Sequence, residues 1–126
     1  MLASSAVMPS RNYKDLIAWQ RAMDLVETVY RATIRMPAEE RFGLTSQMRR
    51  AVVAIPANIA EGQGRRTDGE FLNQLSIAHG SVRELETHVM VAGRLGHIPQ
   101  DRVDEMLSAA GEVGRLVTGL AKSLTH

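Results

Sequence analysis

The apolar residues between positions 71 and 92 recur every seven residues, and this spacing constrains the fold more than any other feature of the chain. They form two rows on one helix face, Phe71, Ala78, Leu85 and Ala92, and Leu75, Val82 and Val89. A seven-residue repeat packs a helix against a neighbour at a shallow crossing angle. Thr67 and Glu70 form a T-x-x-E capping box just before the first row. The pattern therefore predicts a long helix over residues 67–95 inside a helical bundle.

Apolar spacings of three and four predict three further helices, over residues 13–35, 45–61 and 99–123. The residues of the first helix that we expect to face the core are Leu16, Trp19, Met23, Val26, Tyr30 and Ile34. In the next they are Leu44, Met48, Val52, Ile55 and Ile59. In the last they are Val103, Leu107, Ala110, Val113, Val117, Leu120 and Leu124. Short loops favour antiparallel neighbours, so the predicted fold is an all-α, up-and-down antiparallel four-helix bundle.

The length of 126 residues suits one domain. We expect the bundle domain to span residues 13–124, with residues 1–12 as a flexible N-terminal tail. The absence of cysteine excludes disulfides and thiolate metal sites. No apolar run reaches the roughly 18 residues of a membrane-spanning helix, and the N-terminus lacks the basic start of a signal peptide. We therefore expect a cytoplasmic protein with no membrane partner.

The sequence contains no recognisable catalytic pattern. It has no cysteine nucleophile and no G-x-S-x-G elbow. His79 and His88 are nine residues apart and fall on opposite faces of one helix. Glu84 and His88 lie one turn apart, but such a pair is more often a surface hydrogen bond than two metal ligands. We expect no enzymatic activity, no metal and no cofactor.

Arginine dominates the basic residues, since only Lys14 and Lys122 of the fifteen cations are lysine. Arginine favours bidentate pairing with carboxylate or phosphate. The candidate nucleic-acid-binding residues are Arg49, Arg50, Arg65 and Arg66. The last two follow Gly62 and Gly64 at a helix start, which is favourable for an anion. The simpler interpretation, which residue chemistry alone favours, is that these arginines pair with acids of neighbouring helices or subunits, or are solvated.

Several polar residues interrupt the apolar runs of the two central helices. Those we expect to have structural roles, through burial and hydrogen bonding, are Gln47, Asn58, Glu61 and Glu84. Asn58 follows Pro56 by two residues and is expected to bond a carbonyl that the proline leaves free. Arg50 and Glu84 are candidates for an ion pair between the helices, which would specify geometry more than it stabilises.

Two segments carry a family resemblance: FGLTSQMRRAVVAIPANIAEGQGRR at 42–66 and FLNQLSIAHGSVRELETHVMVAGRLGHI at 71–98. With Leu16, Trp19, Gln20 and Ala22 upstream, the chain resembles the four-helix bundle proteins encoded in 23S ribosomal RNA intervening sequences. It is also similar to the accessory variability proteins of diversity-generating retroelements. Two positions depart from the family pattern, Ala54 in place of serine and His97 in place of the usual tyrosine.

The resemblance implies a homopentamer without enzymatic activity. Among the retroelement relatives a basic surface binds nucleic acid and a reverse transcriptase. Carried over to this chain, that surface would involve Arg49, Arg50, Arg65 and Arg66. The intervening-sequence relatives imply no particular function.

Two functions remain open at this point. The first is an oligomer that binds RNA or DNA through phosphate contacts, without reading bases and with strong salt dependence. The alternative is a protein-interaction or scaffold module that binds no nucleic acid. Apolar residues outside the core stripes would then mark a protein interface. The candidates are Val29, Ile77, Val91 and Met106.

Overall fold

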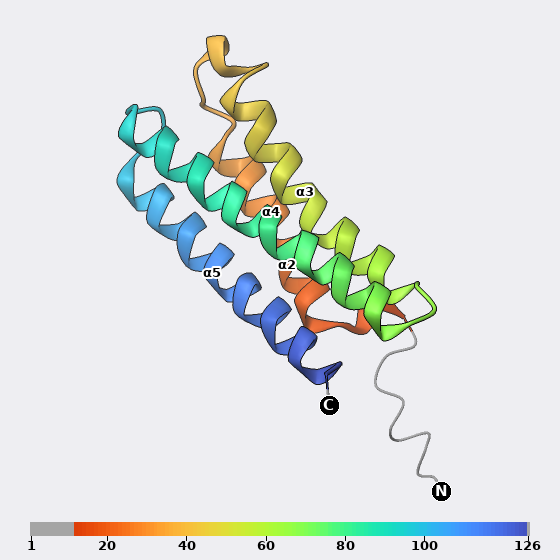
Figure 1. Cartoon of the computed structure of the whole chain (residues 1–126). Helices are drawn as coiled ribbons and strands as arrows, with labels where there is room; N and C mark the ends of the chain where they lie inside the picture. The colour runs from red at the N-terminus through yellow and green to blue at the C-terminus, as the bar shows by residue number, and fades with distance from the viewer. Residues whose placement is uncertain (1–11, 126) are drawn as a thin grey trace, which may run out of the picture.

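Four α-helices make up most of the computed structural model, which describes residues 12–125. They are α2 (Ile17–Ala32), α3 (Leu44–Gln63), α4 (Asp68–Arg94) and α5 (Gln100–Ser123), with short 3-10 turns η1 (Tyr13–Asp15) and η2 (Ala38–Glu40). The helices run alternately in opposite directions (Figure 1). Each contacts two neighbours, and within residues 12–125 α3 and α5 do not touch, so they lie diagonally. The predicted all-α four-helix bundle is confirmed; residues 1–11, most of the predicted tail, lie outside the described part.

Local hydrogen bonds define both ends of α4, at the residues that the sequence predicts. Thr67 Oγ1 accepts a hydrogen bond from the Glu70 backbone N–H at 3.1 Å, as a capping residue does. At the other end Gly96 has a φ of 76°, which favours glycine. The N–H of Gly96 bonds to the Gly93 carbonyl and that of His97 to the Ala92 carbonyl, which completes a Schellman motif.

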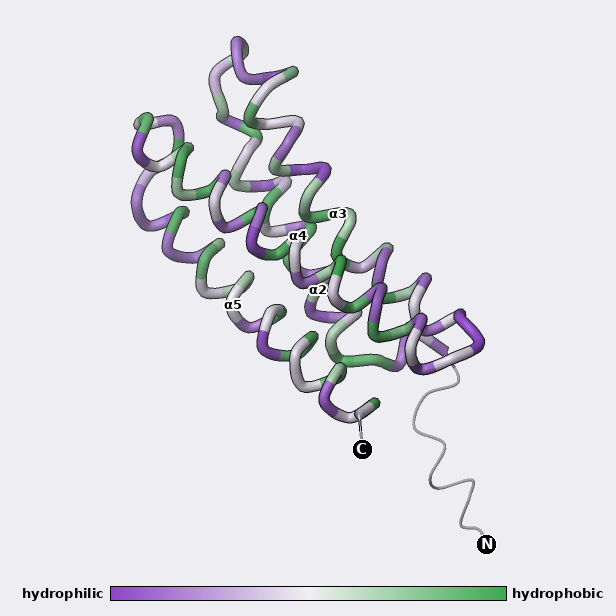
Figure 2. The backbone as a smooth tube through the Cα atoms, viewed as in Figure 1, coloured by the Kyte–Doolittle hydropathy of each residue, from purple (hydrophilic) through white to green (hydrophobic). Residues whose placement is uncertain are grey.

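The core is built from all four helices. In α4 both heptad rows are buried except for Phe71, which is partly buried. The expected core residues of α3 and α5 are likewise buried or packed against the core, with Met106 as an additional core residue. Figure 2 shows hydrophobic and hydrophilic residues interspersed along each helix, as amphipathic helices require.

The prediction for the first helix is wrong for half of its inward face. Leu16, Trp19 and Val26 are partly buried and pack against the core, but the other three predicted residues are exposed. The residues of α2 that are buried are Ala18, Ala22, Leu25 and Val29. Met23, Tyr30 and Ile34 are 40%, 39% and 72% exposed. The buried row lies one position before the predicted one, a rotation of roughly 100°. Both rows have the same spacing. The row with the larger side chains was predicted to face the core, but the neighbouring helices pack closely against the row that contains the small residues Ala18 and Ala22.

The helix also ends earlier than the predicted residue 35. Thr33 is buried, and its Oγ1 donates to the carbonyl oxygens of Val29 at 2.7 Å and Tyr30 at 3.2 Å. A threonine that bonds preceding carbonyls competes with continued helix formation.

The expected interface residues are only partly at the surface. Val29 and Met106 are fully buried in the bundle, so the expectation is wrong for both, whereas Ile77 and Val91 are exposed.

Candidate nucleic-acid interface

The arginines that cluster in the sequence form two separate groups in space. Arg49 and Arg50 lie in the second turn of α3, whereas Arg65 and Arg66 lie just beyond its C-terminal end. The thirteen residues from Arg50 to the end of α3 at Gln63 span roughly 20 Å at 1.5 Å per residue. The two groups therefore cannot surround one phosphate.

Arg49 is held by α2. Its Nε donates to Thr33 Oγ1 at 3.0 Å, and its Nη2 donates to the Tyr30 carbonyl at 3.5 Å. The guanidinium also lies over the Tyr30 ring, 4.5 Å from the ring centroid. These contacts satisfy carbonyl and hydroxyl groups at the end of α2, and they leave part of the guanidinium open to solvent. Arg49 thus has a structural role whether or not it binds a ligand.

Arg50 is exposed and makes no hydrogen bond or ion pair with any residue of 12–125. It borders a groove of about 520 Å³. The residues lining that groove are Tyr30, Arg41, Phe42, Thr45, Ser46, Arg49, Arg50 and Val53. Three of them are arginines, and none of the described residues that line it is acidic. We call Tyr30, Arg41, Phe42, Arg49 and Arg50 the arginine–aromatic surface.

Phe42 is the most exposed large apolar side chain of the described residues, at 88%. The Arg41 guanidinium lies 5.4 Å from its ring centroid, a cation–π contact. Neither Arg41 nor Phe42 was expected from the sequence to be part of a site, and Tyr30 was assigned to the core. The available signal was an aromatic residue beside arginine in a loop of polar residues.

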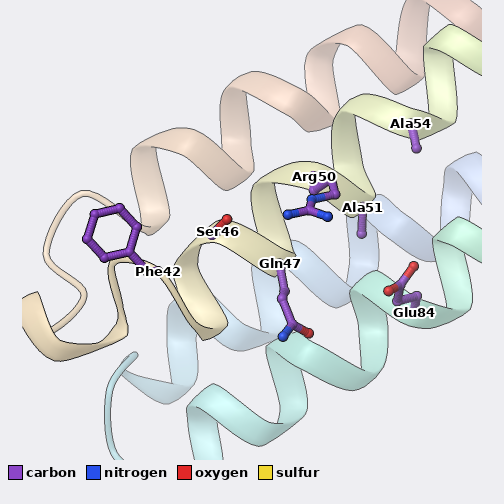
Figure 3. Close-up of a pocket in the computed structure, with 7 residues that line it drawn as sticks. All are labelled: Phe42, Ser46, Gln47, Arg50, Ala51, Ala54 and Glu84. Atoms are coloured by element: carbon purple, nitrogen blue, oxygen red, sulfur yellow. The ribbon is translucent and has the colours of Figure 1, made fainter.

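A second hollow, of about 290 Å³, lies between α3 and α4 (Figure 3). It shares Phe42, Ser46 and Arg50 with the groove and adds Gln47 from α3 and Glu84 from α4. Figure 3 shows Gln47 reaching toward α4. Arg50 and Glu84 line this hollow together, but the described structure places no ion pair between them within 4.0 Å. Ala54 also lines it and presents only a methyl group.

The polar residues expected to be buried are mostly at the surface. Gln47, Glu61 and Glu84 are exposed, so the expectation of burial is wrong for these three. Their helix positions lie beside rather than within the apolar stripes. Asn58 is half-buried, and its Nδ2 donates to the Ala54 carbonyl at 2.8 Å. The carbonyl that lacks the Pro56 donor belongs to Val52, so Asn58 bonds a different one from the carbonyl expected.

The second arginine group is partly neutralised. Arg65 Nη2 lies 2.8 Å from Glu61 Oε2, an i,i+4 ion pair at the end of α3. Arg66 is exposed and has no ion pair or hydrogen bond with another described residue. One unpaired arginine near a helix start attracts an anion less strongly than the three arginines of the groove.

Residues 12–125 contain no group of three or more histidine, cysteine or acidic side chains placed to hold a metal ion. None of the helices in that range has the length and apolar character that crossing a bilayer requires.

The fold and the groove define a small four-helix bundle protein with an arginine-rich, aromatic surface site. The chain belongs to the 23S rRNA-intervening sequence protein family, whose model matches residues 14–119. This confirms the first part of the resemblance. Neither this match nor the structural one below concerns retroelement accessory proteins, so that similarity stays an expectation.

Among solved structures the chain is similar to a protein of unknown function from the S23 ribosomal protein family of Bacteroides thetaiotaomicron. The TM-score is 0.76 and the identity 19%, over 84% of this chain and 99% of that one. At this identity the likeness shows the shared fold alone. No curated protein matches the chain.

Proposed function

We propose that this protein is a non-enzymatic, cytoplasmic homo-oligomer that binds RNA or DNA phosphates on its arginine–aromatic surface. The observation that carries the proposal is the groove that Arg41, Arg49 and Arg50 line without an acidic residue among its described lining. Guanidinium groups that line a groove without a neutralising carboxylate favour phosphate, and Arg50, which has no partner within residues 12–125, can donate two parallel hydrogen bonds to it. The names of the family and of the structural neighbour refer to no reaction, which agrees with a binding role.

Oligomerisation is part of the proposal because one copy of the surface is small. The chain has a net charge of only +1, so a monomer has little long-range attraction for nucleic acid. A homopentamer, which the resemblance implies, would repeat the surface five times around an axis. Linked sites raise the apparent affinity by about 100-fold or more when one ligand can reach several of them.

The test compares two arginines that differ in position but not in partners. Arg50→Ala removes the unpaired guanidinium of the groove. Arg115→Ala is the matched control, since Arg115 is exposed on α5, diagonal to α3, and also lacks an ion pair or hydrogen bond within residues 12–125. Binding to a structured RNA and to a DNA duplex is measured at low salt, with molar mass by light scattering in the same samples.

The proposal predicts a particle of several 13.9 kDa chains that binds nucleic acid, and a loss of affinity for Arg50→Ala alone. Equal effects of the two substitutions would point to diffuse attraction instead of this surface. A multimer that ignores both ligands would contradict the proposal.

A second candidate function is a protein-interaction module, and the exposed apolar side chains favour it. They lie on three of the helices and on the connecting segments: Ile17, Met23, Tyr30, Ile34, Phe42, Val53, Ile77, Met90, Val91 and Leu95. A contiguous apolar patch commonly marks a protein contact. Subunit contacts within the oligomer would cover part of this surface in either function. This second function would be favoured if a protein partner still binds after the groove arginines are replaced, and if replacing exposed apolar residues abolishes the assembly.

A further inference from the structure

From the position and support of Phe42 we infer that the groove takes an unpaired nucleotide, whose base stacks on the Phe42 ring while its phosphate meets Arg50. This inference rests on the proposed function and names the form of nucleic acid that the same site prefers. Stacking on an exposed aromatic ring is the common way to hold single strands, because every base has a flat π-face.

The ring of Phe42 is presented to solvent by a braced loop. Two residues earlier, Glu40 Oε1 accepts a hydrogen bond from the Leu44 N–H at 3.0 Å, which caps α3. Glu40 Oε2 lies 3.2 Å from His97 Nε2 in the α4–α5 turn. A Cβ at Gly43 would come within 2.9 Å of Glu40 Oε1, so glycine there allows the carboxylate to reach its partners. Phe42 is therefore held outside the core by bonds on both sides of it.

The surroundings of the ring suit a nucleotide better than a purely apolar partner. Arg41 lies over the ring, and Arg50 lines both hollows that border it. In the loop the Glu40 carboxylate is engaged by Leu44 and His97, and Glu84 lines only the smaller of the two hollows. Cations beside an exposed ring match a ligand that alternates anionic phosphates with flat bases.

Thr45 is an independent observation that favours a polar ligand in the groove. It lines the groove, it is only 8% exposed, and its Oγ1 has no hydrogen-bond partner among the described residues. Buried hydroxyls are usually bonded. Since less than 1 Å² of this oxygen is accessible, a ligand in the groove would have to displace a neighbouring side chain to give the hydroxyl a partner.

A duplex cannot use the ring, since its bases are stacked on one another and it presents mainly phosphates to this surface. The site should therefore bind an unpaired strand more tightly than the same strand in a duplex. Preference among bases should be weak, because stacking does not read base edges.

The test uses the full chain and a fluorescent oligouridylate, alone and paired with its complement, at one low salt concentration. Phe42→Ala should weaken binding of the single strand by about tenfold. It should leave duplex binding unchanged. Phe42→Tyr should keep the preference, and Phe42→Leu, which is apolar but cannot stack, should lose it. Arg50→Ala should weaken the binding of both the single strand and the duplex.

The outcomes separate this inference from the proposed function. If Phe42→Ala leaves single-strand binding unchanged while Arg50→Ala weakens it, stacking is overturned and phosphate binding stands. If neither ligand binds the unaltered protein, both fail. Light scattering of Phe42→Ala tests one more alternative, that a second copy of the chain covers Phe42. A loss of assembly in this variant would show such a contact and would overturn the inference.

Discussion

Gly62 and Gly80 are both helical glycines, but only Gly62 lies at a close contact between helices. A Cβ added at Gly62 would come within 2.8 Å of Gln74 Cβ and of Phe71 Cδ1, both on α4. A Cβ added at Gly80 would meet nothing within 4 Å. The same substitution, Gly→Ala, should therefore have opposite effects on stability at the two positions.

The magnitudes follow from two competing terms. Alanine is favoured over glycine inside a helix by about 1 kcal/mol, so Gly80→Ala should stabilise by up to that amount. Overpacking costs about 1–3 kcal/mol, because Gln74 Cβ is rigidly attached to the α4 backbone and cannot swing away. For Gly62→Ala the two terms leave a net destabilisation of up to about 2 kcal/mol.

Urea denaturation followed by circular dichroism measures both variants against the unaltered protein. Protein concentration is held constant, because subunit association contributes to the apparent stability of an oligomer. A Gly62→Ala protein as stable as Gly80→Ala would refute the close packing of α3 on α4 at this point.

Three other substitutions test contacts that the sequence did not reveal or that the core depends on. Arg49→Ala should lower the unfolding free energy by about 1–3 kcal/mol, since it leaves the buried Thr33 hydroxyl without its guanidinium donor. Arg50→Ala should leave the unfolding free energy unchanged, and thermal melts of the two variants compare them. Glu40→Ala should cost about 1 kcal/mol through loss of the cap on the Leu44 N–H, measured in urea, and an unchanged midpoint would contradict that role. Leu85→Asp should abolish folding, because Leu85 is fully buried within one chain; a folded monomer by circular dichroism and light scattering would place this seam at a subunit contact.

The sequence predicts α4 well because its signals agree with one another. The heptad spacing of its apolar residues, the Thr67 cap and the glycine at its end all indicate the same helix. The inward face of α2 could not be predicted in this way, since two rows of residues satisfy the same period. Which row is buried depends on how closely α3 and α5 approach α2, and this distance is a property of the assembled bundle.

The candidate site was predicted only in part for a similar reason. Proximity in sequence suggested one arginine cluster, but Arg50 lies near the start of α3 and Arg65 beyond its other end. Arg41 and Phe42 lie just before α3 and line the same groove as Arg50, eight residues after Phe42, but they stand outside the apolar stripes on which the sequence analysis relied. Nor could periodicity reveal that Arg49 is held by Thr33, a contact between residues sixteen positions apart on different segments.

The salt dependence of nucleic-acid binding shows whether Arg50 contacts phosphate in the complex. The logarithm of the association constant for an RNA strand is plotted against the logarithm of salt concentration, for the unaltered protein and for Arg50→Ala. Each phosphate contact contributes about −0.7 to −0.9 to the slope. The account predicts a steep negative slope that becomes shallower by at least one such contact in Arg50→Ala. A flat slope, or an Arg50→Ala protein with the slope and affinity of the unaltered chain, would contradict it.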